Sequence, residues 1–587
     1  MTDVLKKYRE ADYTMPKTIQ AWEMREAGVD NFGVDGQSTE LPFPTPGPDE
    51  LLVRVDAIGI CFSDIKLITQ GSQHMRVFGR DLAANPVVPG HEVSITVIGA
   101  GANAKDKFKV GDRYTVQADV YYKGANLAYG YALTGGMTQY ETIGIEMLQG
   151  DDGCYLLPVK PETGYAEAAL TEPWACVVGA YRIHYRDSIL NGGVALFVEA
   201  GKCKCDEVTI SQGMDEKSHP SKIILSGICG RLKDSIASMA AKLGIELIEV
   251  GSLDEAKLTA LAQERTGERG FDDIIVLGAP SAEQVEMFGA KLAKGGVMAV
   301  IASEKMTGQP QIDVGRVHYD NISFVGTTGN DIAQAYRRKR MSEMQPDGTA
   351  WFIGAAGPMG QMHVQLAVET EGGPTKILAT DVDAVRMQAL KDLVSAKAAE
   401  RKIDIRFVNP KEDGQEAVDH AIQELTGGTG FDDVVLLAPI PFPIPEGIAN
   451  LGQDGIFNIF AGLIRGTKVG IDISPMWMKN VCMVGSSGST INDLRDTLGR
   501  AESGRLSTNL SVAAIGGIDA LGDGVKGVKS NRFTAKTVIF PQIELPLTAV
   551  ADLKDVLPNV YAKLQDGRYW TKEAEEELLR TKLRISS

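Results

Sequence analysis

The sequence contains one strand-like stretch twice, as GFDDIIVLGAP at residues 270–280 and as GFDDVVLLAP at residues 430–439. In both places a glycine and a phenylalanine precede two aspartates and an aliphatic run that ends at Ala-Pro. Short apolar runs bounded by turn residues are typical of strands buried on both faces of a parallel sheet. The repetition raises the question of whether the whole domain around it is duplicated.

The flanking segments repeat in the same order. SKIILSG (221–227) matches TKILATD (375–381), and NISFVGTTG (321–329) matches NVCMVGSSG (480–488). Amphipathic helical patterns separate these strands, which is the rhythm of βαβ units on a parallel sheet. The sequence therefore predicts an α/β protein with two tandem doubly wound domains.

The rest of the chain has a different texture. Residues 1–192 combine short alternating strands with Gly and Pro turns, which indicates a β-rich domain. We expect the doubly wound domains at residues 193–345 and 346–529. The segment 530–587 begins with a Pro-containing strand pattern, and we expect it to return to the first domain and complete it.

Composition excludes some functions. The 587 residues carry a net charge of −17, which repels a nucleic-acid backbone. Seven irregularly spaced cysteines do not indicate a disulfide framework. The N-terminus has no signal-peptide core, and no run of 18 apolar residues suggests a membrane span. We expect a cytoplasmic protein without nucleic-acid or membrane partners.

The second copy opens with AWFIGAAGPMGQMHVQLAVE (350–369), in which a strand runs through Gly354, Gly357 and Gly360 into a helix. Such glycines permit a tight turn, close approach of a pyrophosphate and close helix–strand packing. Asp381 ends the next strand, where a carboxylate holds the ribose hydroxyls of NAD and repels the 2′-phosphate of NADP. The pattern predicts a site for NAD(H) rather than NADP(H), and its loop also contains Pro358 and Met359.

The first copy lacks this loop. Its matching strand, VALFVEAG (194–201), continues into KCKCDEV without further glycines, and no acid ends SKIILSG. We expect a degenerate, structural copy. Cys203 and Cys205 alone cannot fill a tetrahedral metal site.

Three stretches of the β-rich domain carry metal-binding residue types. They are GICFSDIK (59–66), VVPGHEV (87–93) and LTEPWACVVGAYR (170–182). Thiolate, imidazole and carboxylate groups are zinc ligands, and three of them leave an open catalytic position. Taken singly, each has a structural alternative, such as a core cysteine or a helix start at Glu-Pro.

In this order, and followed by a nucleotide-binding domain and a returning tail, these stretches resemble the zinc-dependent medium-chain dehydrogenase/reductases, most of all their polyol dehydrogenase branch. The resemblance implies a GroES-like catalytic domain with one catalytic zinc. It implies metal ligands at Cys61, His91, Glu92 and Glu172, with His91 and Glu92 also catalytic, Ser63 as proton relay, Asp64 orienting His91, and Asp381 and Arg386 binding NAD. The cysteine lobe that binds a structural zinc in many relatives is missing, so no second zinc is expected.

The resemblance also implies an activity. The enzyme is expected to transfer a hydride between NAD(H) and a secondary alcohol or ketone of a polyol, keto-sugar or sugar phosphate. One alternative is an epimerase or isomerase that uses tightly bound NAD, and another is a non-catalytic assembly role. A homo-dimer or homo-tetramer is expected.

Two features bear on the substrate. The basic stretch 71–86, with His74, Arg76 and Arg80, could bind a sugar phosphate or be ordinary surface charge. The tyrosines could line a polyol pocket or pack the barrel; they are Tyr121, Tyr122, Tyr129 and Tyr131.

Overall fold

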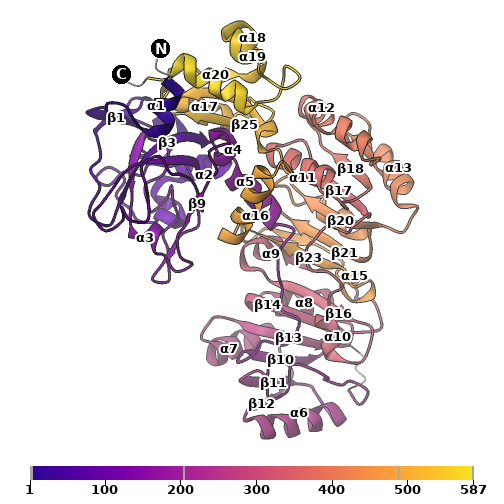
Figure 1. Ribbon diagram of the computed structural model, residues 1–587. Helices are drawn as coiled ribbons and strands as arrows, with labels where there is room; N and C mark the ends of the chain where they lie inside the picture. The colour runs from indigo at the N-terminus through magenta and orange to yellow at the C-terminus, as the bar shows by residue number, and fades with distance from the viewer. Residues whose placement is uncertain (1–3, 202–204, 487, 585–587) are drawn as a thin grey trace. The chain divides into compact units, whose positions relative to one another are not determined.

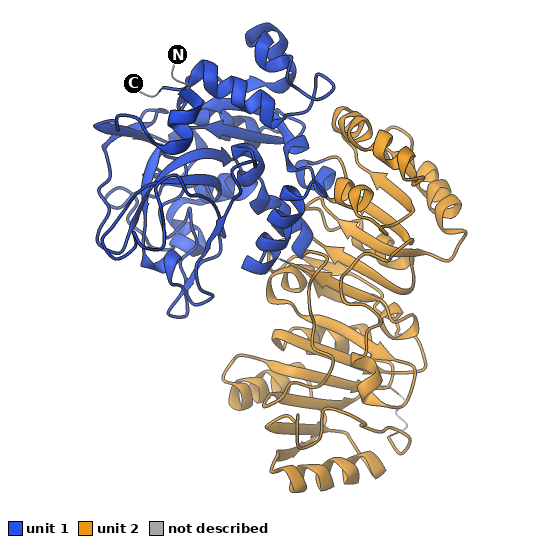
Figure 2. Ribbon diagram, viewed as in Figure 1, with its two compact units in different colours: residues 1–179, 357–362, 488–587 blue, residues 180–356, 363–487 orange. Residues whose placement is uncertain are grey.

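The computed structural model describes residues 4–201, 205–486 and 488–584, and it divides into two compact units (Figures 1 and 2). Unit 1 comprises residues 1–179, 357–362 and 488–587, and unit 2 comprises residues 180–356 and 363–487. Within the described ranges, none of the helices combines the length and apolar character needed to cross a membrane.

Unit 1 is built on an eight-stranded sheet in the order β26-β24-β25-β3-β4-β5-β9, with β8 also paired to β3. The pairs are antiparallel except β24 with β25, which is parallel. The strands are β3 (Leu51–Gly59), β4 (Glu92–Ala100), β5 (Arg113–Val116), β8 (Tyr140–Ile143), β9 (Leu156–Pro158), β24 (Val512–Gly517), β25 (Lys536–Phe540) and β26 (Thr548–Ala549).

The C-terminal segment enters this sheet through β25, which pairs with β3 at Val538 and Gly59. The strand β24 lies beside β25 in the same sheet. Residues from 488 onward accordingly cluster with unit 1, whereas the sequence pattern placed the end of the second doubly wound domain at residue 529. The difference arises because β24 finds its partner in β25 and not in the parallel sheets.

The helices of unit 1 pack against this sheet and against one another. The longer ones are α1 (Val4–Glu10), α2 (Phe62–Gln70), α5 (Thr171–Gly179), α16 (Ile491–Glu502), α17 (Leu521–Lys529) and α20 (Lys572–Lys582). Short helices are α3 (Ile145–Leu148), α4 (Tyr165–Ala169), α18 (Leu553–Val556) and α19 (Pro558–Tyr561). Helices α5 and α16 pack against each other, and Glu172 in α5 is buried.

Unit 2 contains two six-stranded sheets, both parallel throughout (Figure 1). Their orders are β12-β11-β10-β13-β14-β16 and β19-β18-β17-β20-β21-β23, the doubly wound arrangement of dinucleotide-binding folds. The first copy has β10 (Val194–Glu199), β11 (Lys222–Ser226), β12 (Glu246–Val250), β13 (Phe271–Leu277), β14 (Leu292–Ile301) and β16 (Ser323–Thr327). The second copy has β17 (Thr349–Ile353), β18 (Lys376–Thr380), β19 (Asp404–Val408), β20 (Phe431–Leu436), β21 (Leu451–Ile459) and β23 (Cys482–Gly485).

Helices lie between the strands of each copy. The first copy has α6 (Gly230–Leu243), α7 (Glu255–Thr266), α8 (Ala282–Gly289), α9 (Val314–Asp320) and, after its last strand, α10 (Ile332–Tyr336). The second copy has α11 (Pro358–Glu369), α12 (Ala384–Glu400), α13 (Gln415–Thr426), α14 (Ile444–Ala449) and α15 (Pro475–Met478). One hydrophobic cluster contains buried residues of both sheets, including Phe271 and Phe431 of the repeated stretches.

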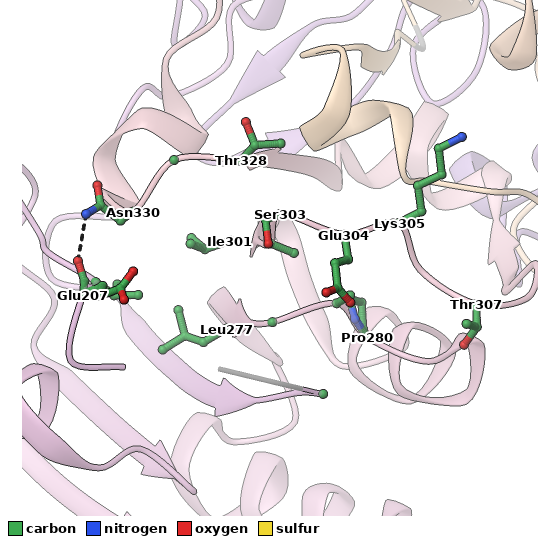
Figure 3. Close-up of a pocket in the computed structure, with 16 residues that line it drawn as sticks. Glu207, Leu277, Pro280, Ile301, Ser303, Glu304, Lys305, Thr307, Thr328 and Asn330 are labelled. Carbon is green, nitrogen blue, oxygen red and sulfur yellow. Dashed lines mark hydrogen bonds between the residues drawn. The ribbon is translucent and has the colours of Figure 1, made fainter. Parts of the chain in front are cut away.

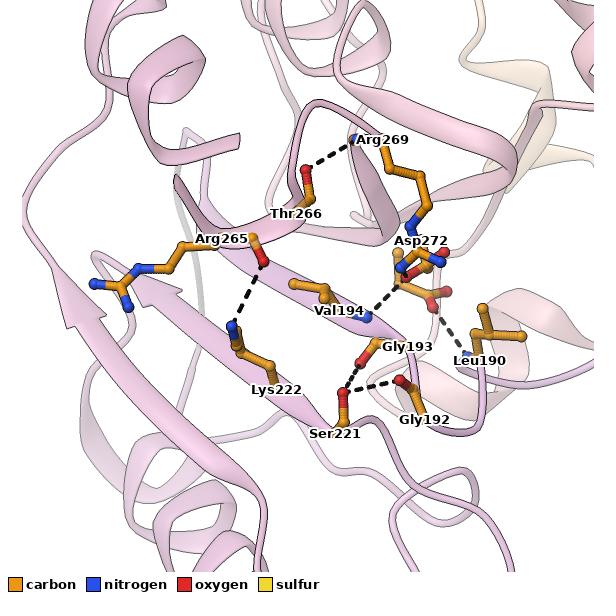
Figure 4. Close-up of polar contacts among 12 residues, drawn as sticks. Leu190, Gly192, Gly193, Val194, Ser221, Lys222, Arg265, Thr266, Arg269 and Asp272 are labelled. Atoms are coloured by element: carbon orange, nitrogen blue, oxygen red, sulfur yellow. Dashed lines mark hydrogen bonds and ion pairs between the residues drawn. The ribbon is translucent and has the colours of Figure 1, made fainter. Parts of the chain in front are cut away.

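The first aspartate of each GFDD stretch joins the start of two neighbouring strands. Asp272 accepts a hydrogen bond from the backbone N–H of Val194 at 2.9 Å (Figure 4), and Asp432 accepts one from Thr349 at 2.8 Å. Val194 and Thr349 are the first residues of β10 and β17. The same contact therefore aligns the central strands of both sheets.

The second aspartate pairs with an arginine in both copies. Arg186 Nη1 lies 2.6 Å from Asp273 Oδ1, and Arg340 Nη1 lies 2.6 Å from Asp433 Oδ1. Burial raises the pKa of Asp433 to about 6, although Arg340 acts in the opposite direction. GFDD is thus a structural signature that fixes the N-terminal edge of each parallel sheet.

Candidate metal centre and dinucleotide site

The candidate metal ligands lie at the facing ends of two paired strands in unit 1. Cys61 follows β3, and His91 and Glu92 stand at the start of β4. Since Gly59 of β3 pairs with Glu92 of β4, the register brings the three side chains together. One ligand atom from each of Cys61, His91 and Glu92 lies within 4.8 Å of the others. Sulfur, nitrogen and oxygen donors of this kind suit zinc.

Glu92 is completely buried, and its two carboxylate oxygens have different surroundings. Oε1 accepts a hydrogen bond from Lys536 Nζ at 2.5 Å, whereas Oε2 is buried without a hydrogen-bond partner. A Cβ placed on Gly59 would lie only 2.1 Å from Oε2, so a glycine is needed there. A buried carboxylate oxygen without a partner is costly unless a cation fills the place, and this observation fits a bound metal ion.

The sequence did not identify Lys536 as part of this site. The residue begins the apolar strand β25, and its side chain is only 5% exposed. Burial lowers the pKa of Lys536, but the interactions with Glu92, Cys61 and Asp64 together outweigh that effect, so the pKa is raised. No local pattern indicated this contact, because the two residues are far apart in the chain.

Asp64 positions two of the ligands. Its Oδ1 lies 3.0 Å from His91 Nδ1, and its Oδ2 accepts a hydrogen bond from the Cys61 backbone N–H at 2.9 Å. A carboxylate on one ring nitrogen fixes the tautomer and leaves the other nitrogen available to a metal. Burial lowers the pKa of His91, but the interactions with Asp64, Tyr131 and Cys61 together raise it by more, so the net shift is upward.

Ser63 stands beside these ligands. Its hydroxyl donates to Cys61 Sγ at 3.0 Å, and its oxygen lies 3.3 Å from His91 Nε2. A hydroxyl in this position can pass a proton to or from a group bound between the thiol and the imidazole. The geometry is therefore compatible with the relay role expected for Ser63.

Glu172 is near the three ligands but is not part of the compact group. It lies in the first turn of α5, and burial raises its pKa to about 7, with His91 and Glu92 among the charges that affect it. The thiol of Cys176, one turn later, lies 4.0 Å from Glu172 Oε1. Among the residues that the structure describes, Cys61, His91 and Glu92 form the one group of three metal-binding side chains.

The basic stretch and the tyrosines separate into structural residues and residues near the metal group. Arg76 Nη2 lies 2.6 Å from Asp119 Oδ1, and the Arg76 guanidinium lies over the ring of Tyr131. The ring centroids of Tyr131 and His91 are 5.9 Å apart. Arg80 instead donates to backbone carbonyls, including that of Pro86. The two arginines therefore have different surroundings, and Arg76 is the one beside the site.

His74 and the four tyrosines differ in how close they lie to the metal group. His74 stacks on Tyr131 with ring centroids 5.5 Å apart. Tyr129 is fully buried and donates to Glu141, which indicates packing, and Tyr121 and Tyr122 form the short strand β6. Of the four tyrosines, Tyr131 is the one with a ring contact to His91.

The glycine loop of the second copy has the geometry of a tight strand-to-helix turn. Gly354 follows β17 with φ of 80°, and a Cβ there would lie 2.7 Å from the Ala438 backbone nitrogen. A Cβ on Gly357 would meet nothing within 4 Å. Pro358, Met359 and Gly360 are the first residues of α11. The loop therefore has open space beside Gly357, directly before a helix N-terminus, where anions are favoured.

Asp381 lies directly after β18 and contacts this turn. Its Oδ2 accepts a hydrogen bond from the Ala356 backbone N–H at 2.9 Å. A cavity of about 140 Å³ adjoins it and is lined by Gly354, Val382 and Phe442 among others. Arg386 lies in the first turn of α12, and its Nε is 3.8 Å from Asp383 Oδ2. A carboxylate next to an apolar cavity is the arrangement expected for the adenosine half of a dinucleotide.

The corresponding edge of the first copy is different. Strand register places Glu199 where the second copy has Gly354, and Gly227 where it has Asp381. The Glu199 side chain adjoins Gly227, since a Cβ there would lie 3.2 Å from Glu199 Cβ. Cys203 lies outside the described residues. The first copy thus has neither the first glycine of the loop nor the acid in its usual place.

A cavity of about 630 Å³ lies at the C-terminal edge of the first sheet (Figure 3). Glu207, Glu304 and Lys305 contribute its charged groups, and Asn330 donates to the Glu207 carbonyl. Two carboxylates against one ammonium group do not favour a pyrophosphate. This cavity is larger than the one beside Asp381, but its charged groups do not suit a dinucleotide.

Comparisons with known proteins place this architecture. The family model "Alcohol dehydrogenase GroES-like domain" matches residues 47–172. The uncharacterized protein YggP of Escherichia coli is 30% identical over 338 residues, which cover 54% of this chain and 76% of that protein. The chain belongs to the zinc-dependent medium-chain dehydrogenase/reductase superfamily. It is therefore a dehydrogenase, with a GroES-like domain and Rossmann-type sheets, that acts on a small molecule.

Two other members of the superfamily have named activities. Mannitol-1-phosphate 5-dehydrogenase of Aliivibrio fischeri is 29% identical, with 60% of this chain and 85% of that protein covered. L-Sorbose 1-phosphate reductase of Klebsiella pneumoniae is 27% identical, with 57% and 83% covered. These matches support oxidoreduction and give no support to the isomerase alternative.

Proposed function

We propose that the protein transfers a hydride between NAD(H) and a secondary alcohol or ketone of a polyol, keto-sugar or sugar phosphate, at a single zinc ion. Cys61, His91 and Glu92 would hold the metal, and Glu172 would serve as a further ligand, directly or through water. The observation that carries this proposal is the compact group of thiol, imidazole and carboxylate, together with the unpartnered oxygen of Glu92. When bound, zinc supplies Lewis-acid chemistry and the dinucleotide accepts or supplies the hydride.

The chain's own residues support the chemistry around these groups. Asp64 holds His91 in the tautomer whose Nε2 faces the metal position, and it also holds the Cys61 backbone. Lys536 neutralises Glu92 by donating a hydrogen bond to its Oε1. Ser63 bridges the thiol and imidazole and would carry the substrate's proton away from the buried site.

The cofactor preference and the setting are also proposals. Asp381 supports NAD over NADP, because a carboxylate repels the 2′-phosphate. A thiolate ligand such as Cys61 supports a reducing, cytoplasmic compartment. A homo-dimer or homo-tetramer remains the expected assembly, which light scattering would check.

The substrate class is supported from two sides. The names of two relatives contain sugar or polyol phosphates, and Arg76 is a cation beside Tyr131 and the metal group. Asp119 neutralises that cation, which favours an uncharged polyol or keto-sugar unless the phosphate displaces the carboxylate. Both substrate types therefore belong in an activity panel.

The test combines metal content with activity on D-sorbitol, D-mannitol and their phosphates. The purified protein should contain about one zinc per chain, since one tetrahedral site is proposed, and should form NADH with a member of the panel. Cys61→Ser should lose both the zinc and the activity. Cys154→Ser, which changes a half-buried cysteine elsewhere in unit 1, should retain both. Full zinc content in Cys61→Ser, or two zinc ions per wild-type chain, would contradict the proposal.

A further inference from the structure

The two copies of the duplicated domain contact each other through equivalent segments. In the first copy, β15 (Gln311–Asp313) lies between β14 and α9, and in the second copy β22 (Lys468–Gly470) lies between β21 and α15. These two strands pair antiparallel, with Gln311 opposite Gly470 and Asp313 opposite Lys468. Antiparallel pairing of equivalent segments is what a two-fold axis between the copies produces.

A pair of glycines repeats the same contact in both directions. Gly326 of β16 pairs with Val300, and Gly485 of β23 pairs with the equivalent Ile459, so the two glycines occupy the same position in their sheets. A Cβ on Gly326 would lie 2.7 Å from Trp477 Cβ of the other copy. A Cβ on Gly485 would lie 2.9 Å from His318 Cα, again of the other copy. Each sheet edge is therefore shaped to admit the other copy's helix.

His318 and Trp477 are themselves equivalent residues. Each stands three residues before an asparagine with φ of 52°, Asn321 or Asn480. His318 Nδ1 lies 2.9 Å from the Ile459 carbonyl of the second copy, and Trp477 Nε1 donates to the Glu304 carbonyl of the first at 2.9 Å. Both rings are buried, so these polar contacts form in a closed interface.

We infer that the first copy is a built-in partner for the second, so that a two-fold interface of the kind found between identical subunits is closed within one chain. The contacts are reciprocal, as in an isologous interface, and one hydrophobic cluster runs through both sheets. The edge strands of the two sheets, β16 and β23, lie against each other. Any assembly of identical chains uses a different surface.

This inference gives the first copy a role that needs no cofactor. Its glycine loop and acid are absent, yet the residues that meet the second copy are present in matching positions. The role concerns assembly and does not rest on the proposed activity, so the two can fail separately.

The test is a disulfide between β15 and β22 in the full chain. Directly opposed residues of an antiparallel pair lie within the range of a disulfide. Gln311→Cys combined with Gly470→Cys should form, on oxidation, a bond within one chain. Non-reducing electrophoresis should show a single-chain band of altered mobility that reverts with reductant, and peptide mass spectrometry should identify the linked pair. Gln311→Cys alone should show no shift.

A second double variant, Asp313→Cys with Lys468→Cys, tests the same strand pairing at another position, in case the first two cysteines fail to form a disulfide for a local reason. A band at twice the chain mass with either double variant would show that the strands pair between chains, and it would overturn the inference. Absence of any disulfide in both folded double variants would also overturn it, because the pairing itself would then be wrong.

Discussion

The two copies of the doubly wound domain agree at one edge of the sheet and differ at the other. At the N-terminal edge, the GFDD aspartates make the same contacts in both copies. Asp272 and Asp432 bind the first residue of the neighbouring strand, and Asp273 and Asp433 each pair with an arginine. At the C-terminal edge, the second copy has the glycine turn and Asp381, and the first does not. The comparison shows that the contacts that build this fold are separable from those that bind its cofactor.

The largest expected effect concerns the shared edge. Arg340→Met should destabilise the second copy by about 3–5 kcal/mol, because Asp433 would remain buried without its partner. Arg186→Met should cost less, since the Arg186 side chain is 19% exposed against 7% for Arg340. Hydrogen exchange followed separately in β13 and β20 would measure both.

Arg406→Met is the control for that pair, because Arg406 is exposed on the second copy and its loss should change exchange little. If Arg340→Met behaved like Arg406→Met, the pairing of Asp433 with Arg340 would not stabilise the second copy.

The next effect concerns the edge that differs. Gly357→Leu should weaken NAD binding about 100-fold, or about 2.8 kcal/mol, by filling the space proposed for the pyrophosphate. The fold should tolerate the change, because no atom lies within 4 Å of the added Cβ. Calorimetric titration with NAD, alongside thermal unfolding, would check both statements.

Gly251→Leu provides the matched control in the first copy, since a Cβ there also meets nothing within 4 Å. It should leave NAD affinity unchanged. An equal loss of affinity in both variants would mean that the first copy also takes part in dinucleotide binding.

The smallest effect concerns cofactor choice. Asp381→Ser should shift the ratio of kcat/KM for NAD over NADP by about tenfold toward NADP, because the repulsion of a 2′-phosphate disappears. Asp383→Ser is the comparison, since serine preserves the helix cap that Asp383 provides to α12. A similar shift in both variants, or in neither, would remove Asp381 from its assigned role.

Sequence alone determined the repeated features. The duplicated GFDD stretches predicted two parallel sheets, and the structure has two with the same strand order. The glycine spacing and Asp381 predicted a turn with an acid beside it, and the hydrogen bond from Ala356 to Asp381 places them together. These features are readable because each depends on residues close in sequence or on a regular period.

Only the tertiary structure decided which distant groups share a site. Glu92 and Lys536 are separated by 444 positions, and no local pattern indicates that one neutralises the other. Likewise, β24 joins the sheet of unit 1, and β15 pairs with β22. Buried backbone groups and buried charges are costly without a hydrogen-bond or ion-pair partner, and that partner can lie far away in the sequence. The sequence therefore determined the elements and the chemistry they carry, whereas long-range pairing decided the metal group's surroundings and the role left to the first copy.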